Sequence, residues 1–168
     1  AAGRVGLVAV RAVLVRVGSG GGADAAADLG RRFSGVGYSV SRLPYTDEAG
    51  RTGRTVLAVK PAAQPGADIL VLSAHHDSDP TAYGANDNAS GVAALLYTAQ
   101  ALRELPTDTE IRFVSFTDEE NGKKGSAAYL ASLDEEERSR IVGDIRVALL
   151  GGLGTRGPGG ESTRCLER

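Results

Sequence analysis

The chain has 168 residues, enough for one domain with a sizeable core. Its net charge of −2 gives no basic footprint for nucleic acid or an anionic membrane, and no apolar run reaches the ~20 residues of a membrane-spanning helix. A single cysteine, Cys165, excludes an internal disulfide framework and a zinc site built from cysteines.

Apolar segments alternate with amphipathic ones along the chain, which is the pattern of an α/β domain. The apolar segment 5–17 is interrupted by Arg11 and Arg16, whereas a signal peptide needs an unbroken apolar centre, so we interpret it as the first core segment. A glycine-rich turn then leads into a helix over 23–33, and a strand begins at Tyr38.

The middle of the chain predicts two strands and a helix. The strands, 54–61 and 68–77, are separated by the turn signal AAQPGA, and the second is a continuous apolar run typical of a strand covered on both faces. From Ser90 onwards apolar residues recur at three- and four-residue spacing. This spacing predicts a helix that Ser90 caps and Pro106 ends.

The segment EIRFVSFTDEE (110–120) predicts another buried strand with two carboxylates at its end. Three further elements are expected after it: helices over 126–133 and 135–142, and a strand over 145–150. We expect Ser126 to cap the first of these helices. Residues 151–168 contain six glycines and little apolar periodicity, so we expect an irregular tail after a domain that spans 1–150.

Histidine and carboxylate side chains gather where strands are predicted to end, which is where sites form in open α/β sheets. They are His75 and Asp77 after one strand, Asp87 in the following loop, and Glu119 with Glu120 after another strand. A metal explains this mixture, because imidazole and carboxylate are zinc ligands, a carboxylate can bridge two ions, and an unligated carboxylate can act as general base. Each of these segments, taken alone, is also typical of an ordinary turn or helix cap. The ordered combination is the stronger signal.

The same segments resemble a known family. HHDS (75–78), GANDNASG (84–91) and FVSFTDEENGKKGSAAY (113–129) are similar to the segments of the M28 zinc aminopeptidases. The resemblance covers roughly residues 19–150 and is dense over 68–130. It implies a three-layer α/β fold of the zinc-peptidase kind, with a central, mostly parallel mixed sheet flanked by helices.

The resemblance also implies a role for each matching residue. Three residues would hold two zinc ions: His75, Asp87 as the bridge, and Glu120. Asp77 would orient the imidazole, as carboxylates commonly do for metal-bound histidines, and Glu119 would be the general base. We do not expect His76 to be a ligand, because successive side chains on a strand point to opposite faces.

Two ligands of the family have no counterpart in this sequence. An aspartate is expected at the end of the next strand, at about Gly151, and a histidine near the C-terminus, but no histidine follows His76. Asp144 would lie about 23 Å before that position on an extended strand, too far to substitute. Each zinc would keep two protein ligands, with Asp87 shared. We therefore expect weak zinc binding and impaired hydrolysis.

Truncation, a sequence error and a degenerate paralogue would each produce this ending. The chain also lacks methionine, even at position 1, which favours a processed product, a fragment or an edited sequence.

The expected function is that of a metallo-aminopeptidase, which releases N-terminal residues from peptides with a metal-activated water. One alternative is a non-catalytic binding or structural domain of the same fold, and a more distant one is a single-zinc acyl transferase of the glutaminyl cyclase kind. The expected partner is a peptide substrate, with neither nucleic acid nor membrane. The resemblance favours a secreted or extracytoplasmic location, while oligomeric state and side-chain preference stay open.

Overall fold

The computed structural model describes residues 21–150, so the predictions for segments 5–17 and 151–168 fall outside the described residues. The described elements, in chain order, are α1 (Gly21–Val36), β1 (Ser39–Thr46), β2 (Thr52–Lys60), β3 (Ile69–His75), η1 (Ala85–Ser90), α2 (Gly91–Leu102), β4 (Glu110–Phe116), α3 (Lys124–Ser132), α4 (Glu135–Arg140) and β5 (Ile141–Arg146).

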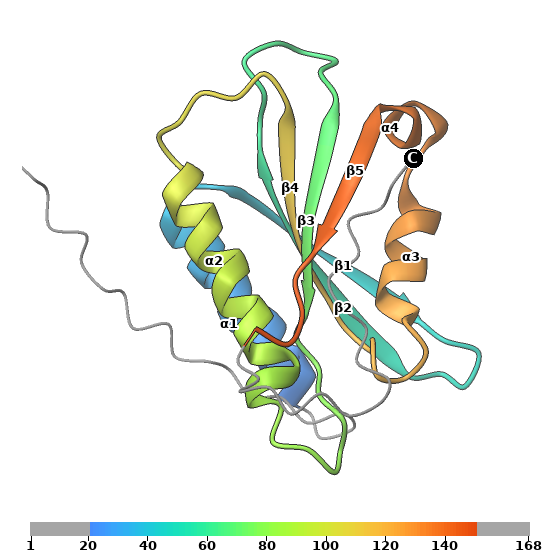
Figure 1. Ribbon diagram of the computed structural model, residues 1–168. Helices are drawn as coiled ribbons and strands as arrows, with labels where there is room; N and C mark the ends of the chain where they lie inside the picture. Colours follow the sequence, from blue (N-terminus) through green and yellow to red (C-terminus); the bar gives the residue numbers. More distant parts are fainter. Residues whose placement is uncertain (1–20, 151–168) are drawn as a thin grey trace, which may run out of the picture.

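The five strands of the described chain form one sheet in the order β1-β2-β4-β3-β5 (Figure 1). β2 pairs antiparallel with both of its neighbours, whereas β3 pairs parallel with β4 and β5, so four strands run one way and β2 runs against them. The mostly parallel mixed sheet is therefore confirmed. Pro44 lies in β1, where an edge strand tolerates the missing N–H.

Helices cover both faces of the sheet, which confirms the three layers. α1 and α2 lie side by side on one face, and α3 lies on the other (Figure 1). The core under α1 and α2 includes Leu29, Phe33, Leu95 and Phe113. The core under α3 is made of Ile69, Val71, Val114, Phe116, Tyr129 and Leu133.

Alternation along β3 explains its continuous apolar run. Leu72 and Ala74 belong to the core under α1 and α2, whereas Ile69 and Val71 belong to the core under α3. Because β3 and β4 are parallel neighbours, in register from Ile69 to His75, their carboxyl ends meet at one edge of the sheet.

The last helix and strand differ from the sequence prediction. α4 ends at Arg140 and β5 occupies 141–146, where a helix to 142 and a strand over 145–150 were expected. β5 is an edge strand, and its Val142 and Ile145 are 61% and 51% exposed. A strand with one neighbour tolerates glycine and charge, so IVGDIR lacks the apolar run by which β3 and β4 are recognised.

Two predicted caps are also corrected. Ser90 precedes α2 but makes no side-chain cap; its hydroxyl donates to the carbonyl of Asn86. Ser126 lies inside α3, where its hydroxyl donates to the carbonyl of Lys123. The first turn of α3 lies close to the backbone of Thr117 because Gly125 has no side chain. A Cβ at Gly125 would meet the carbonyl oxygen of Thr117 at 2.2 Å.

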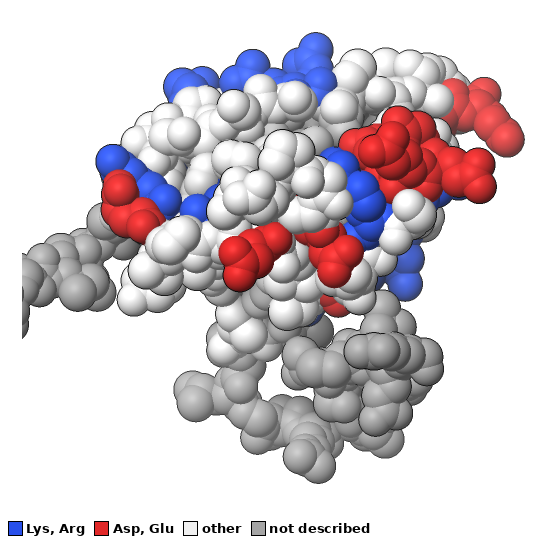
Figure 2. Space-filling model, turned by 90° about the horizontal axis from the view of Figure 1, so that it is seen from above, with Lys and Arg blue, Asp and Glu red and all other residues white. Residues whose placement is uncertain are grey.

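Charges of both signs lie at the end of the molecule opposite the carboxyl ends of β3 and β4. Figure 2 views this end, where α4 lies, and shows acidic side chains gathered beside basic ones. α4 carries acids in its first turn and Arg138 and Arg140 in its last turn, which suits the helix dipole. Separately, no helix within residues 21–150 combines the length and apolar character that a membrane span requires.

Candidate metal centre

The first component of the centre is His75, the last residue of β3. Its Nδ1 lies 3.1 Å from the main-chain oxygen of Asp77 and 3.4 Å from Oδ1 of the same residue. These acceptors favour the ring proton on Nδ1 and leave Nε2 as the metal-binding nitrogen. The side chains of His75 and Asp77 are both buried, 3% and 6% exposed, so the ring is held firmly on this side.

Asp87 approaches the other nitrogen of the ring. Its Oδ1 lies 3.1 Å from His75 Nε2, and its side chain is 44% exposed. If the ring proton is on Nδ1, two electron-rich atoms face each other, so this contact needs a proton or a cation between them. Two ligand atoms bound to one zinc ion at ~2.0–2.1 Å with tetrahedral angles lie about 3.3 Å apart, close to the distance here.

The η1 turn that carries Asp87 is fixed from two sides. The Asn88 side chain donates to the carbonyl of Val147 at 2.9 Å and accepts from the N–H of Gly91 at 3.0 Å. A Cβ at Gly91 would lie 2.3 Å from Asn88 Oδ1 and 2.4 Å from Val147 O, so only glycine allows α2 to start here. Asn88 thus ties the turn to the chain that follows β5.

The loop after β4 brings two carboxylates to the same place. The N–H of Glu120 donates to Asp77 Oδ2 at 3.1 Å, which joins this loop to the end of β3. Donor atoms of His75, Glu119 and Glu120 all lie within 4.8 Å of one another, close enough to share one metal ion.

The hairpin between β1 and β2 supports this loop from outside. The Tyr45 hydroxyl donates to Asp118, and Lys124 Nζ lies 2.7 Å from Asp47 Oδ2. Lys124 and Arg51 together hold the pKa of Asp47 well below its usual range, so its carboxylate stays charged. The loop that carries Glu119 and Glu120 is therefore anchored at both ends.

The pKa shifts in the centre show concentrated negative charge. Burial lowers the pKa of His75, but the hydrogen bond to Asp77 and the surrounding carboxylates outweigh it, and the pKa is raised. Burial raises the pKa of Asp77, but its hydrogen bonds with His75 and with loop N–H groups prevail and lower it. Burial and the charge of Asp87 raise the pKa of Glu120. A cation would relieve this repulsion.

His76 lies outside this cluster. Its Nδ1 is 3.0 Å from the hydroxyl of Ser115, the residue that pairs with Ala74 in the parallel register. Ala74 belongs to the core under α1 and α2, so His76 is buried towards that face. Burial lowers its pKa to about 4, which keeps the imidazole neutral.

The sequence predicted the residues that meet here but not every contact among them. His75, Asp77, Asp87, Glu119 and Glu120 converge, while their individual roles stay predictions. Sequence reasoning missed Arg146, which forms an ion pair with Glu119. Its position at the carboxyl end of a parallel strand would have revealed it, had the strand been placed at 141–146.

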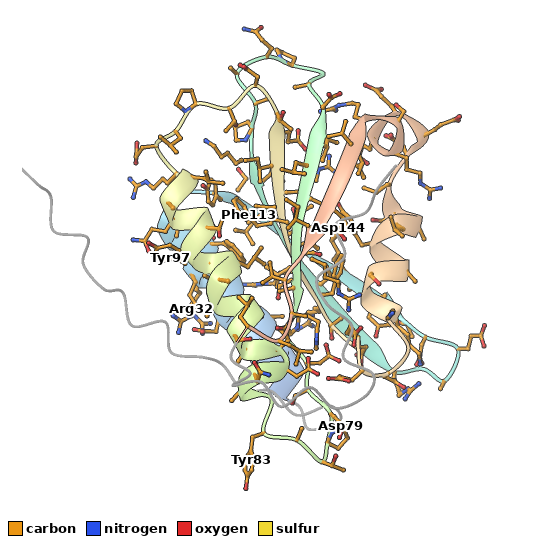
Figure 3. All side chains as sticks on the ribbon, in the orientation of Figure 1. Arg32, Asp79, Tyr83, Tyr97, Phe113 and Asp144 are labelled. Carbon is orange, nitrogen blue, oxygen red and sulfur yellow. The ribbon has the colours of Figure 1, made fainter. Side chains whose placement is uncertain are left out.

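The end of β5, where a further aspartate was expected, carries no carboxylate in the described chain. Ser73 pairs with Arg146, and the N–H of Val147 donates to Ser73 O, so in the same register His75 lies level with Ala148. The expected position, at about Gly151, lies three residues further along the chain and outside the described residues. Asp144 lies within β5 (Figure 3) and accepts from Ser73 Oγ at 2.9 Å. Burial raises its pKa.

Comparison with known proteins identifies the family. The family described as Peptidase family M28 matches residues 55–156. The chain belongs to peptidase family M28. This confirms the resemblance and covers every residue of the centre.

Two similar proteins are much longer than this chain. Aminopeptidase YwaD from Bacillus subtilis is 37% identical over 102 residues, which are 60% of this chain and 22% of that protein. Leupeptin-inactivating enzyme 1 from Streptomyces exfoliatus is 31% identical over 122 residues, 71% of this chain and 27% of that protein. The chain thus spans about a quarter of the length of these relatives.

Solved structures share the fold. A zinc aminopeptidase from Bacillus subtilis superposes with a TM-score of 0.59 at 37% identity, over 61% of this chain and 25% of that chain. A glutaminyl cyclase from Porphyromonas gingivalis gives a TM-score of 0.66 over 82% of this chain and 54% of its own, at 24% identity. At that identity the second likeness shows the fold alone.

Proposed function

We propose that this chain carries the central part of a zinc-dependent aminopeptidase site, which acts on the first residue of a peptide. The observation that carries the proposal is the convergence of His75, Glu119 and Glu120 donor atoms within 4.8 Å, beside Asp87. Two relatives support the metal and the substrate class, since one is named an aminopeptidase and another a zinc aminopeptidase.

Three side chains would hold the ion: His75, Asp87 and Glu120. This donor set suits zinc, whose catalytic sites use three protein ligands and keep one position open. When bound, zinc supplies Lewis acidity, which polarises a peptide carbonyl and acidifies water. Asp77 holds the His75 ring in the orientation that presents Nε2.

Glu119 would be the general base. Its carboxylate lies among the ligand atoms, and its Oε1 accepts from Arg146, so Oε2 is the oxygen that we assign to proton transfer. Glu119 accepts a proton from the attacking water and returns it to the amine that leaves when the peptide bond breaks.

A second candidate is a domain of the same fold that binds metal or peptide without catalysis. The residues at and after the end of β5 favour it, because Val147, Ala148, Leu149 and Leu150 offer no side-chain ligand. A two-zinc site would need a ligand there, as the family resemblance implies.

Zinc binding and turnover of an aminoacyl-anilide, measured on the purified 168-residue chain, test both candidates. We expect one weakly bound zinc ion and slow hydrolysis that a chelator removes. Glu119→Gln should keep zinc and lose hydrolysis, whereas Glu120→Gln should lose zinc affinity. Glu104→Gln, an exposed change near the far end of α2, is the control. A chain that binds no zinc would overturn the proposal, and zinc binding without hydrolysis would favour the non-catalytic domain.

A further inference from the structure

Arg146 brings a guanidinium into a cluster of carboxylates. It is the last residue of β5, and its Nη2 donates to Oε1 of Glu119. The Glu119 side chain is 18% exposed and that of Arg146 is 40% exposed, so the pair lies at the wall of the centre. The other ion pairs that the structure gives to these carboxylates come from His75, with Asp77 and with Asp87.

Arg146 and a second metal ion would compete for the same place. The donor atom of the contacted carboxylate, Glu119, lies within 4.8 Å of those of His75 and Glu120, so the guanidinium charge would lie close to an ion held by these residues. Like charges at this separation repel, and half-exposed sites weaken but do not remove the repulsion. A first ion, held by three protein ligands, would overcome this repulsion more easily than a second ion, which would have fewer protein ligands.

We propose that Arg146 takes the place of a second cation, so that the centre holds one divalent ion through His75, Asp87 and Glu120. The guanidinium neutralises Glu119 and positions its carboxylate for proton transfer. The ligand count agrees: while Arg146 pairs with Glu119, the centre offers three other ligands among residues 21–150, enough for one zinc ion and too few for two. Arg146 is therefore a positioning and selectivity residue rather than a ligand.

This inference rests on the proposed zinc site and is tested by stoichiometry rather than turnover. Zinc binding to the metal-free chain would be measured by calorimetry and by competition with a chromophoric chelator. The variants are Arg146→Gln, Arg146→Lys and the control Arg103→Gln. Arg103 lies at the far end of α2 and is 55% exposed, so its change removes the same charge away from the centre.

We expect one zinc ion per wild-type chain. Arg146→Gln should bind the first ion about fivefold more tightly, which corresponds to the ~1 kcal/mol that a half-exposed ion pair contributes, and should show a second, weaker ion because Glu119 is released. Arg146→Lys and Arg103→Gln should resemble the wild type. Two ions in the wild type, or no change in Arg146→Gln, would overturn this inference and leave the zinc site standing. Absence of zinc binding in every variant would instead overturn the proposed function, and with it the inference.

Discussion

The two nitrogens of His75 meet different chemistry. Nδ1 faces the main-chain and side-chain oxygens of Asp77, both buried, whereas Nε2 faces the half-exposed carboxylate of Asp87. This asymmetry favours Nε2 as the nitrogen that would bind a metal, and Asp77, which we do not propose as a ligand, would orient the ring.

Replacing the orienting carboxylate should weaken metal binding without removing a ligand. Asp77→Asn keeps the size of the side chain but loses the charge that raises the pKa of His75. We expect zinc affinity to fall about 10–100-fold, measured by chelator competition, and the pKa of His75 to fall in an NMR titration of the metal-free chain.

The matched control is Asp79→Asn. Asp79 lies two residues further along, on the loop that extends beyond the sheet in Figure 3, and its carboxylate accepts from Thr81. The Asp79→Asn change removes the same charge without altering a contact of the His75 imidazole. An equal loss of affinity in the two variants would mean that general attraction, and not orientation, explains the effect.

At the scale of elements, α2 joins the centre to the core. It begins directly after the η1 turn that carries Asp87, and its inner face packs on the sheet through Val92, Leu95 and Leu96. The position of Asp87 therefore depends on how well α2 is packed.

Truncating the inner face of α2 should cost far more stability than truncating its outer face. Leu95 is 1% exposed, so Leu95→Ala leaves a cavity and should lower the free energy of unfolding by roughly 2–5 kcal/mol. Tyr97 is 62% exposed and points away from the sheet in Figure 3, so Tyr97→Ala should change the free energy of unfolding by less than about 0.5 kcal/mol. Urea unfolding measures both, and similar costs would contradict the packing of α2.

Elements buried on both faces were predictable, and the edge of the sheet was not. Residues of β3 and β4 alternate between two cores, so their sequences are apolar throughout and their ends could be located. β5 has one neighbour and an exposed face, and its Gly143 and Asp144 resemble a loop. The prediction therefore moved the strand to the more apolar IRVALL, and Arg146 was not assigned to the strand end where it meets Glu119.

The same limit applies within the centre. The identities of His75, Asp87 and Glu120 follow from their spacing and the family resemblance. The contacts of Asn88 with Val147 and of Tyr45 with Asp118 join segments far apart in the chain, and no local pattern records them.

At the scale of the whole molecule, buried His76 links stability to pH. Burial lowers its pKa in the folded state to about 4, against 6.5 when exposed. Above pH 6.5 both states are neutral at this residue. Between pH 6.5 and 4 the unfolded chain binds a proton at His76 that the folded chain does not bind. The free energy of unfolding therefore falls as pH falls, by up to about 1.4 kcal/mol per pH unit.

Urea unfolding of the metal-free chain, from pH 7 to pH 4.5, measures this slope. His75 has a raised pKa and acts in the opposite direction, so the wild type must be compared with His76→Gln, which cannot titrate there. We expect the free energy of unfolding to fall less steeply in the variant. Parallel pH profiles would show that His76 does not contribute.

The crossover segment, which runs from β3 through α2 and β4 to the loop that follows β4, contains every residue proposed to hold the ion or move the proton, whereas Arg146 comes from β5. In evolutionary terms, the number of ions that the centre takes and the identity of its ligands and base are therefore encoded by separate segments. Substitutions at the end of β5 can change how many ions the centre takes while the crossover keeps the base and the ligands intact. A descendant with aspartate at the position of Ala148 and a neutral residue at Arg146 would change metal stoichiometry without any mutation in the crossover.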